Sequence, residues 1–351
     1  MLLNQYAGAV HVHSVHSHDG RRSVDHILKS AKRAKLDFIM LTDHGNLSAK
    51  EREGWQDGVL LAVGEEITPR FNHYLVFGMD DCIDVREEED VPPGSYVAAV
   101  AKSGGIGIIA HPDHQGAPLF HVKHYPWCDW SVSGFTGMGI WDFMTDWQSA
   151  LTSFHRALWA YCFPASVLKG PRRETLSRWD SLIRFGPVVG VGELDNHDTL
   201  YSLGGIALGV FSFRRAFHFI RTYIFSETPF CGDRTKDISL LLSSLRRGRA
   251  FAALDYYKCA RGFVFYLSDG EITAWPGDRL VVKGEYRVEV SLPSSGHIRI
   301  IRDGTLAAAG EGQSLSLVAR DRGCYRVEVF SMTGSVMHPW IFSNHIVVEE
   351  A

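Results

Sequence analysis

The segment YAGAVHVHSVHSHDG, residues 6–20, decides how the chain is interpreted, because an apolar run ends there in four closely spaced histidines. Residues 6–12 have the pattern of a short buried strand. His11 and His13 lie two positions apart at its end, so both side chains are expected on one face, where they can converge on one ion. Because neighbouring histidines also occur by chance, the pair alone is weak evidence for a metal site.

Short apolar runs and helical patterns alternate from residue 6 to about residue 255. After the first strand, apolar residues recur at helical spacing from Val24 to Ala34, and this helix is expected to end near Lys35. Repeated strand–helix units favour an α/β fold with a mainly parallel sheet, closed or nearly closed into a barrel. Further strands are expected at 37–42, 58–67, 73–77 and 105–110, and a further helix at 97–102.

An aromatic-rich stretch at about 113–186 interrupts this alternation and contains six of the nine tryptophans. Helices are expected within it at about 147–161 and 173–185. Insertions of this kind over a barrel often shape a substrate pocket. For any single tryptophan, however, packing is the more common role.

After an amphipathic helix at 237–247 the chain changes to short alternating segments separated by turn signals. At 286–290 apolar and polar side chains swap at period two, the pattern of a strand with one wet face. Residues 259–351 are therefore expected to form a small antiparallel β-sandwich domain that follows a first domain at 1–258. Its strands are expected at 262–267, 279–282, 286–292, 297–302, 314–318, 324–330 and 341–348.

The composition is that of a globular protein of two domains, with 351 residues, 45 % of them hydrophobic and 22 % charged. A formal charge of -4 supplies no basic field for a nucleic-acid backbone, so no nucleic-acid polymer is expected as a partner. The six cysteines have neither zinc-ribbon nor disulfide spacing. No signal peptide and no run of about 18 apolar residues is found. We therefore expect a cytoplasmic protein without a membrane partner, whose oligomeric state stays open.

Polar side chains follow or flank several of the later apolar runs, as the histidines do after the first. In a barrel, the carboxyl ends of parallel strands converge on one mouth, so residues far apart in sequence become neighbours. Buried carboxylates and imidazoles are costly unless paired, and divalent cations can neutralise the carboxylates and use the imidazole lone pairs. Mixed nitrogen and oxygen donors suit zinc, manganese or iron. The segments concerned are 42–44, 64–66, 72–73, 110–112 and 195–197.

These motifs, taken in order, resemble the PHP (polymerase and histidinol phosphatase) superfamily. They are HVHS (11–14), SHDG (17–20), TDH (42–44), GEEI (64–67), His73, HP (111–112) and DNH (195–197). The ending WIFSN (340–344) resembles the Trp-x-x-Ser-Asn motif of the carbaryl-hydrolase-like branch, so the likeness covers nearly the whole chain. It implies a distorted (β/α)7 barrel that holds two or three divalent ions (Mn, Zn or Fe). The ligands that it implies are His11, His13, Asp19, His44, Glu66, His73, His111, Asp195 and His197.

Within that set, the resemblance gives Glu66 the role of a bridging carboxylate, because the family pattern is Gly-x-Glu before an aliphatic residue. Glu65 is expected to hold Glu66 in place without contacting an ion itself. The family usually has Ser-Asp-Gly after the His-x-His segment, whereas this chain inserts His18. Either Asp19 or His18 then reaches the ion, and Asp19 is favoured because Gly20 still follows it.

Other polar residues near these motifs have weaker claims. Arg70 would place a cation near the metals and suit an anionic substrate, although a surface arginine is an equally good interpretation. His16 is expected to face solvent or to support a ligand. His114, His121 and His124 are interpreted as ordinary loop residues.

The resemblance implies a metal-dependent hydrolase in which a metal-bridging hydroxide attacks the substrate, with Glu66, Asp195 and His197 as catalytic residues. The first hypothesis is a phosphoesterase that acts on a mono- or diester of a small molecule or nucleotide. The second is a carbamate or carboxylic ester hydrolase with the same metal centre, since the nearest branch contains such an activity. The third is a non-catalytic binding protein with a β-sandwich recognition module, against which the complete ligand set argues.

Overall fold

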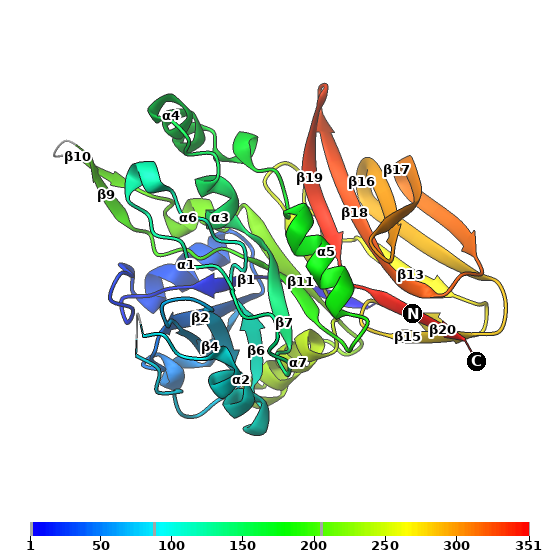
Figure 1. Cartoon of the computed structure of the whole chain (residues 1–351), viewed down its shortest axis with the longest axis horizontal. Coiled ribbons are helices and arrows are strands. Elements are labelled where there is room, and N and C mark those ends of the chain that lie inside the picture. Colours follow the sequence, from blue (N-terminus) through cyan, green and yellow to red (C-terminus); the bar gives the residue numbers. More distant parts are fainter. Residues whose placement is uncertain (1–2, 87–88, 204–205, 351) are drawn as a thin grey trace.

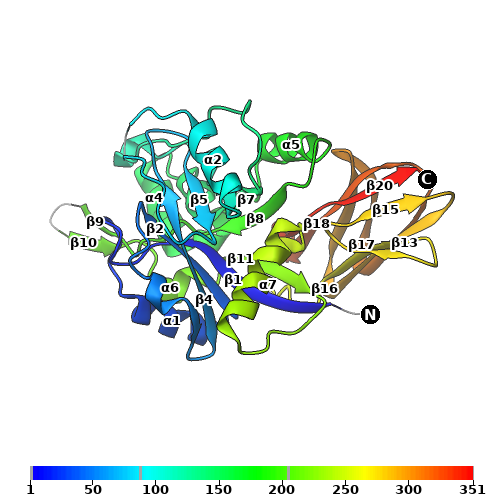
Figure 2. The ribbon, with the colours of Figure 1, turned by 90° about the horizontal axis from the view of Figure 1, so that it is seen from below.

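The structure is a computed structural model that describes residues 3–86, 89–203 and 206–350. A mixed α/β part lies beside a C-terminal part made of strands (Figure 1). The second view shows the same division, with α7 (Arg234–Arg246) next to β11 (Ile220–Ser226) (Figure 2). A mixed α/β fold with one large sheet and few helices is therefore present, in agreement with the expected fold class. No helix in these ranges is long and apolar enough to span a membrane.

Seven strands of the α/β part form a row that returns to its starting point. They are β1 (Asn4–Val12), β2 (Phe38–His44), β4 (Val59–Ile67), β5 (Tyr74–Phe77), β6 (Ile106–Ile109), β7 (Gly137–Asp142) and β8 (Val189–Glu193). β2 is parallel to β1 and β4, β5 is antiparallel to β4 and β6, and β6, β7 and β8 are parallel. Beyond β8, the N–H of Leu194 donates to the carbonyl oxygen of Val10, and Val12 bridges to Asn196. The end of β8 therefore lies beside the end of β1.

Only some of the connections between these strands contain a helix. Helix α1 (Val24–Arg33) lies between β1 and β2, α2 (Pro93–Lys102) lies between β5 and β6, and α5 (Arg173–Leu182) precedes β8. Helix α1 begins at Ser23, whose side chain accepts a hydrogen bond from the N–H of His26. Between β2 and β4 the chain forms only a short 3-10 helix, η1 (Lys50–Arg52), and β3 (Gly54–Gln56). Residues 68–73, which join β4 to β5, are too few for a crossover helix, so β5 runs antiparallel. The regular strand–helix alternation expected from the sequence is thus interrupted.

The aromatic-rich stretch contains the ring strand β7 as well as helices. The single helix expected at 147–161 is two helices, α3 (Phe143–Gln148) and α4 (Phe154–Cys162). They are separate because Ser153 caps α4 with a hydrogen bond from the N–H of Arg156. The short helices η2 (Pro118–Phe120) and η3 (Pro164–Val167) complete the stretch. Packing is the role of the four buried tryptophans, Trp127, Trp141, Trp147 and Trp179.

After β8 the chain leaves the ring. A hairpin of β9 (Leu200–Leu203) and β10 (Ile206–Gly209) is followed by α6 (Phe213–Ala216). β11 then runs antiparallel to β1, and β12 (Ala250–Leu254) is antiparallel to β11. Because β12 also pairs with β19 (Val336–Ser343), the hydrogen-bonded sheet continues across the expected boundary at residue 258.

Antiparallel strands dominate the C-terminal part. They are β13 (Val264–Ser268), β14 (Thr273–Ala274), β15 (Arg279–Val282), β16 (Tyr286–Arg302), β17 (Thr305–Ala319), β18 (Gly323–Thr333), β19 and β20 (Ile346–Glu350). β16 is one strand where two were expected, because its irregularity between Ser291 and Gly296 is a bulge against β17 and not a turn. Its first half pairs with β13 and its second half with β18. The expected strand at 341–348 is divided between β19 and β20 by Asn344 and His345.

The C-terminal strands are held to the α/β part by apolar and polar contacts. Their inward side chains share one core with Tyr223 and Phe225 of β11 and Phe251 of β12. Asn344 lies between β8 and β12, where its Oδ1 accepts from the N–H of Gly190 at 2.8 Å. Its Nδ2 donates to the carbonyl oxygens of Gly190 and Ala250 at 2.8 and 2.9 Å. The C-terminal part therefore contacts directly the strand that leads to Asp195.

Candidate metal centre

The predicted ligands gather where strands of the ring end, and we refer to these nine residues as the ligand cluster. His11 lies at a register irregularity in β1, between Val10 and Val12, with a φ of 67°. The imidazoles of His11 and His13 therefore meet at a bulge and not along a regular strand. His111 and Asp195 also have positive φ, 27° and 48°. Such conformations are uncommon for residues other than glycine and concentrate at functional sites.

The carboxylate of Glu66 lies at the centre of the ligand cluster and is 1 % exposed. Its Oε2 faces Nε2 of His11 at 3.0 Å, Nε2 of His13 at 3.4 Å and Nδ1 of His44 at 3.2 Å. Its Oε1 faces Nδ1 of His73 at 3.0 Å and Nε2 of His111 at 3.3 Å. The two oxygens of one carboxylate thus divide five imidazoles into two groups.

A second carboxylate, that of Asp195, lies on the Oε2 side of Glu66. Its Oδ1 lies 3.3 Å from Nε2 of His11 and 3.6 Å from Nε2 of His13. The backbone oxygen of Asp195 lies 3.3 Å from Nδ1 of His197, which leaves the other nitrogen of that ring free to face the cluster. The segment after β8 thus closes the group around His11 and His13.

The loop at 14–20, which contains the inserted His18 and is called the inserted loop below, brings Asp19 and His18 to the same side of the cluster. Oδ2 of Asp19 lies 3.2 Å from Nε2 of His197 and 3.4 Å from Nε2 of His44. His18 is exposed, and its ring stacks on that of His44 with the centroids 5.2 Å apart. Both residues therefore lie within reach of one ion at His44, and Asp19 is also in contact with His197.

The donor set fits divalent ions. Ligand atoms bound to one ion at about 2.1 Å lie about 3.0–3.4 Å apart, which is the range of most separations given above. Within the described part of the chain, the buried atoms without a hydrogen-bond partner include Nε2 of His11, Nε2 of His13, Nδ1 of His44 and Oε2 of Glu66. Four groups have donor atoms within 4.8 Å of one another: His13, His44 and His197; His11, His13, Glu66 and Asp195; His18, Asp19 and His44; Glu66, His73 and His111. Three residues, His13, His44 and Glu66, belong to two groups each, so neighbouring groups share donor residues.

The outer nitrogens of three imidazoles have partners that fix the tautomer. Nδ1 of His11 lies 2.9 Å from Oε2 of Glu193, Nδ1 of His13 lies 3.1 Å from Oγ of Ser17, and Nε2 of His73 lies 3.1 Å from the carbonyl oxygen of Pro69. When each outer nitrogen donates its proton to such an acceptor, the inner nitrogen presents a lone pair to the cluster. This support of the ring is characteristic of metal-bound histidine.

Glu193 was not among the residues singled out from the sequence, although it contacts two members of the cluster. It is fully buried, and besides His11 its carboxylate accepts from the N–H of His111 at 3.3 Å. Gly139 on β7 makes room for it, because a Cβ there would lie 1.3 Å from Oε1 of Glu193. The signal that could have found it is the one used for the other carboxylates, a charged residue at the end of the apolar run 188–192.

The loop after β1 is fastened by Asp43 of β2. Its Oδ1 accepts from the N–H of Ser14 at 2.6 Å and from the hydroxyl of Ser17 at 3.0 Å, and its Oδ2 accepts from the hydroxyl of Ser14 at 2.7 Å. The hydroxyl oxygen of Ser17 accepts in turn from the N–H of His44 at 3.0 Å. Asp43 therefore orients His13 indirectly, through Ser17.

Protonation of the cluster is governed by the attraction between its carboxylates and imidazoles. Burial raises the pKa of Glu66, but the imidazoles around it, His11 first, hold that pKa well below its usual range. Burial lowers the pKa of His44, yet the neighbouring carboxylates of Asp19 and Glu66 raise it to about 10. The pKa of His111 is likewise raised to about 9 by its hydrogen bond with Glu66. A metal ion would have to displace these protons, so binding should weaken as the pH falls.

Glu65 and Arg70 lie outside the ligand cluster. Glu65 does not support Glu66, since successive side chains of a strand point to opposite faces; its Oε1 accepts instead from the N–H of Ile83 at 2.8 Å. Arg70 is exposed, with its guanidinium 5.3 Å from the centre of the Phe71 ring, and it does not line the cavity described below.

The remaining loop histidines are not part of the cluster. His16, His121 and His124 are exposed. His114 is buried, with Nε2 2.9 Å from Oε1 of Gln148 and Nδ1 accepting from the N–H of Tyr125 at 3.1 Å. Burial, with the nearby imidazoles, lowers the pKa of His114 to about 3, so this ring is neutral.

A cavity of about 150 Å³ opens onto the ligand cluster. It is lined by His18, Asp19, His44, Glu66, Thr68, Pro69, His73, His111, Tyr125, Asp195 and His197. The cluster is therefore accessible to a small ligand from one side.

Among the comparisons with known proteins, a family model matches the segment that carries the amino-terminal part of this site. Among solved structures, one similar chain is that of a protein from Bifidobacterium adolescentis, provisionally named a metal-dependent phosphoesterase. It is 13 % identical, with a TM-score of 0.35, and the alignment covers 57 % of this chain and 92 % of that chain. No curated protein matched the chain. The family model of the PHP domain matches residues 9–118, the segment that contains His11, Glu66 and His111.

Proposed function

We propose that this protein is a metal-dependent hydrolase of the PHP superfamily and that it cleaves a phosphate mono- or diester of a small molecule or nucleotide. The observation that carries this proposal is the buried carboxylate of Glu66, which has imidazoles against both of its oxygens. A carboxylate in that position can bridge two cations. The match of residues 9–118 to the PHP domain supports the same assignment independently.

We infer in the same way that the ring of seven strands is the distorted (β/α)7 barrel of that superfamily and occupies residues 1–258. The parallel bridge between Val12 and Asn196, which brings β8 back to β1, supports a closed ring. Residues 259–351 would then form the attached β-sandwich domain. β16 pairs first with β13 and then with β18, as expected for a strand that belongs to both layers of a sandwich.

We assign two or three divalent ions (Mn, Zn or Fe) to the nine residues of the ligand cluster, with Asp19 preferred to His18 in the inserted loop. Asp19 is favoured because it contacts both His44 and His197. When bound, such ions lower the pKa of a coordinated water towards neutrality and offset the charge that develops on the phosphate oxygens.

The side chains have separate tasks in this scheme. Glu66 holds negative charge between the two groups of imidazoles. Asp195, whose side chain is 17 % exposed, has Oδ1 directed at His11, so its Oδ2 can accept a proton from the attacking water. His197, whose side chain is 15 % exposed, lines the same cavity and can contact the substrate. Arg70 follows the cavity residue Pro69 and remains a candidate contact for the negative charge of the substrate.

The proposal is tested by stripping the protein of metal and adding back manganese, zinc or iron one at a time. Each form is assayed with 4-nitrophenyl phosphate, bis(4-nitrophenyl) phosphate, 4-nitrophenyl acetate and 1-naphthyl N-methylcarbamate. We expect phosphate-ester hydrolysis that depends on added metal. Metal-dependent hydrolysis of the carbamate or the acetate alone would favour the second hypothesis. No metal-dependent turnover of any substrate would overturn the enzyme assignment.

A further inference from the structure

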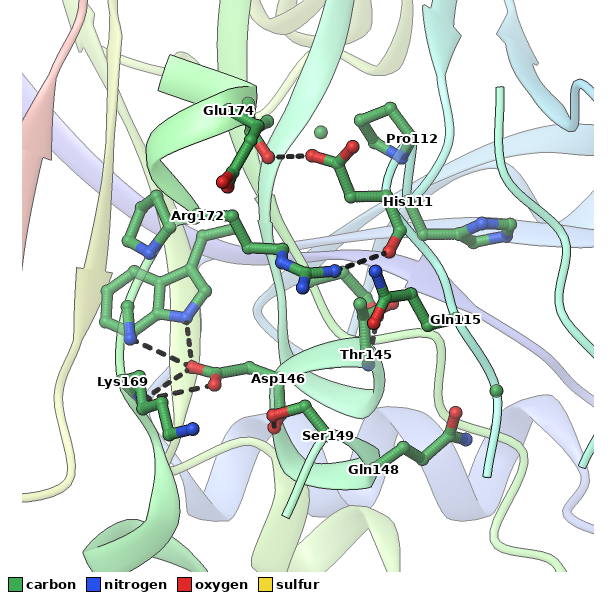
Figure 3. A pocket seen from close by; sticks show the side chains of 18 of the residues that line it. His111, Pro112, Gln115, Thr145, Asp146, Gln148, Ser149, Lys169, Arg172 and Glu174 are labelled. Atoms are coloured by element: carbon green, nitrogen blue, oxygen red, sulfur yellow. Dashed lines mark hydrogen bonds between the residues drawn. The ribbon is translucent and has the colours of Figure 1, made fainter. Parts of the chain in front are cut away.

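A second and larger cavity, of about 810 Å³, shares His111 with the cavity at the ligand cluster. Figure 3 shows residues that line the larger cavity. The smaller cavity has room for about five waters at ~30 Å³ each, which suits a phosphoryl group but no larger organic group. Binding pockets for organic ligands have volumes of about 300–1,000 Å³. The larger cavity therefore has the size to hold the part of a substrate that lies beyond the scissile bond.

Four segments form the walls of this cavity, which we call the Arg172 pocket. They are the loop at 111–119, the end of β7, helix α3 with the residues after it, and the segment 169–175 that leads into α5. In Figure 3, Arg172 extends towards the centre of the labelled side chains, between Asp146 and the chain that follows His111. The side chain of Arg172 is thus available to a ligand in the pocket.

Three of the four carboxylates that line this cavity accept hydrogen bonds from other groups of the protein. Asp146 accepts hydrogen bonds from Nε1 of Trp141 at 3.0 Å and from the N–H groups of Lys169 and Gly170, both at 3.0 Å (Figure 3). Asp113 accepts from the hydroxyl of Thr175. Oδ1 of Asp142 accepts from the N–H of Thr145 at 2.6 Å, at the start of α3. These hydrogen bonds offset part of the negative charge of the three carboxylates.

The cations that line the cavity form no ion pair with these three carboxylates. The guanidinium of Arg172 donates one hydrogen bond, to the carbonyl oxygen of Asp113 at 3.3 Å. Across the described ranges, neither Arg172 nor Arg173 nor Lys169 forms an ion pair. Glu174, the carboxylate nearest to them in sequence, is exposed and also lines the cavity. The first turn of α5 lies in the same wall and adds the positive end of a helix dipole. The wall at 169–175 thus presents unpaired positive charge to the cavity.

We infer that the Arg172 pocket binds a second anionic group of the substrate, a carboxylate or a phosphate, carried by the organic part of a phosphate ester. The inference rests on the proposed function, which places the scissile phosphate at the ligand cluster. A guanidinium suits this task because its planar set of donors can hold either anion through two parallel hydrogen bonds. Selection for a doubly anionic ester would follow.

The test compares three phosphate esters that differ at one position of the ring: 4-carboxyphenyl phosphate, 1,4-phenylene bisphosphate and the neutral 4-carbamoylphenyl phosphate. We expect Arg172→Met to lower kcat/KM about tenfold to a hundredfold for an anionic ester, since a charged hydrogen bond is lost. The carbamoyl ester should be affected less than about twofold. Whichever of the two anionic esters loses more identifies the group that the pocket takes.

Two variants serve as controls. Arg178→Met removes the same charge from α5 outside the pocket, where Arg178 stacks on Trp130 at 4.2 Å, and it should leave all three rates unchanged. Arg172→Lys keeps the charge and should retain part of the preference. Equal losses for all three esters, or no loss in Arg172→Met, would overturn the inference while the proposed function stands.

Binding is measured separately so that turnover is not required. Titration with 4-carboxybenzylphosphonate, which cannot be hydrolysed, should show an affinity that falls in Arg172→Met and not in Arg178→Met. If the wild type binds it in this way but hydrolyses no phosphate ester, the proposed function fails and the anion site remains. If the affinity is the same in both variants, the anion site is refuted whatever the enzyme turns over.

Discussion

The ligand cluster and the C-terminal strands are built in opposite ways. In the cluster, buried ring nitrogens and a carboxylate oxygen lack hydrogen-bond partners, and His11, His111 and Asp195 have left-handed backbones. In the C-terminal part, burial along β16 alternates at period two, and the buried Arg326 is paired with carboxylates. Polar atoms without partners and residues with strained backbones destabilise a fold, so they persist only where the rest of the structure holds them in place. The geometry of the cluster thus suits the binding of a ligand, whereas the C-terminal part, which we call the supporting region, has the regular pattern of a structural sheet.

The supporting region acts on the cluster through β8. Along the edge of this strand, two side chains take the place of a neighbouring backbone. Asn344 satisfies both the N–H and the carbonyl oxygen of Gly190, at 2.8 Å each. Thr222 does the same for Gly192, at 2.9 and 2.7 Å. Glu193 follows directly, so the position of this carboxylate depends on contacts made by other parts of the chain.

The largest effect is expected for Glu66→Gln, which removes the charge between the two groups of imidazoles. Loss of a residue that only supports a metal ligand costs about ten- to a hundredfold, so kcat should fall by more than about a hundredfold. Metal content, measured by elemental analysis, should fall with it. Glu65→Gln is the matched control, because the Glu65 side chain points to the other face of β4. If Glu66→Gln is as active as this control, its bridging role is refuted.

The next largest effect is expected on the stability of the fold, through the contacts between α5 and the C-terminal strands. Asp180 in α5 accepts hydrogen bonds from Nε and Nη2 of Arg326 at 2.7 and 2.9 Å, and its Oδ1 lies 2.7 Å from Nε2 of His345. Removing one partner of a buried ion pair costs about 3–5 kcal/mol, so Asp180→Asn should lower the free energy of unfolding by this amount at pH 7. Metal content should not change. Asp321→Asn, in an ion pair with 72 % exposure at Asp321, should cost less than about 1 kcal/mol.

The stabilisation by Asp180 should depend on pH. Burial raises the pKa of Asp180, but hydrogen bonds from Arg326 and His345 outweigh it and lower this pKa to about 2. Since the unfolded value is about 3.9, the charged carboxylate stabilises the folded state fully above pH ~4 and progressively less as the pH falls towards 2. Urea titrations of the wild type and Asp180→Asn should therefore converge at low pH. A constant difference would contradict this origin of the stability.

A smaller effect is expected for Glu193→Gln, which keeps the shape of the side chain but weakens its hold on Nδ1 of His11. Metal affinity should fall about ten- to a hundredfold, the range known for residues behind a ligand. At saturating metal most of the activity should return, because the ligands themselves are intact. The control is Glu311→Gln, whose side chain is 84 % exposed. Lost activity that metal does not restore would mean that Glu193 has another task.

The smallest effect separates the two residues of the inserted loop. Asp19→Ala should weaken the most loosely bound ion by about tenfold, since Asp19 contacts both His44 and His197. His18→Ala should change metal affinity little, because His18 is exposed and contacts His44 by stacking. Calorimetric titration of the stripped variants with manganese measures both. The reverse order would identify His18 as the ligand.

Much of this organisation could be predicted from local patterns. The spacing of Val24, Ile27, Leu28 and Ala31 matches the buried face of α1, and the apolar run at 58–67 is β4. The convergence of His11, Glu66 and His111 was expected from strand ends alone. β7 was missed, since Gly137 and Gly139 interrupt its apolar run. These glycines are needed by tertiary contacts, for Gly139 makes room for Glu193 and Gly137 for Val189.

Other features could not be predicted because they depend on partners distant in sequence. Whether β5 runs parallel or antiparallel is decided by the short link before it. The continuity of β16 depends on pairing with β17 across the bulge, which local turn signals around Gly296 do not report. The role of Glu193 follows from contacts with His11 and His111, which lie 182 and 82 positions away.

If the ligand cluster holds several divalent ions, as we propose, these ions can be counted. Metal-stripped protein is reloaded with manganese, freed of excess metal and analysed for manganese per chain, beside Glu66→Gln and Glu65→Gln. We expect two or three ions per chain in the wild type and in Glu65→Gln, and fewer in Glu66→Gln. Less than one ion per chain in the wild type, or an unchanged number in Glu66→Gln, would contradict this proposal.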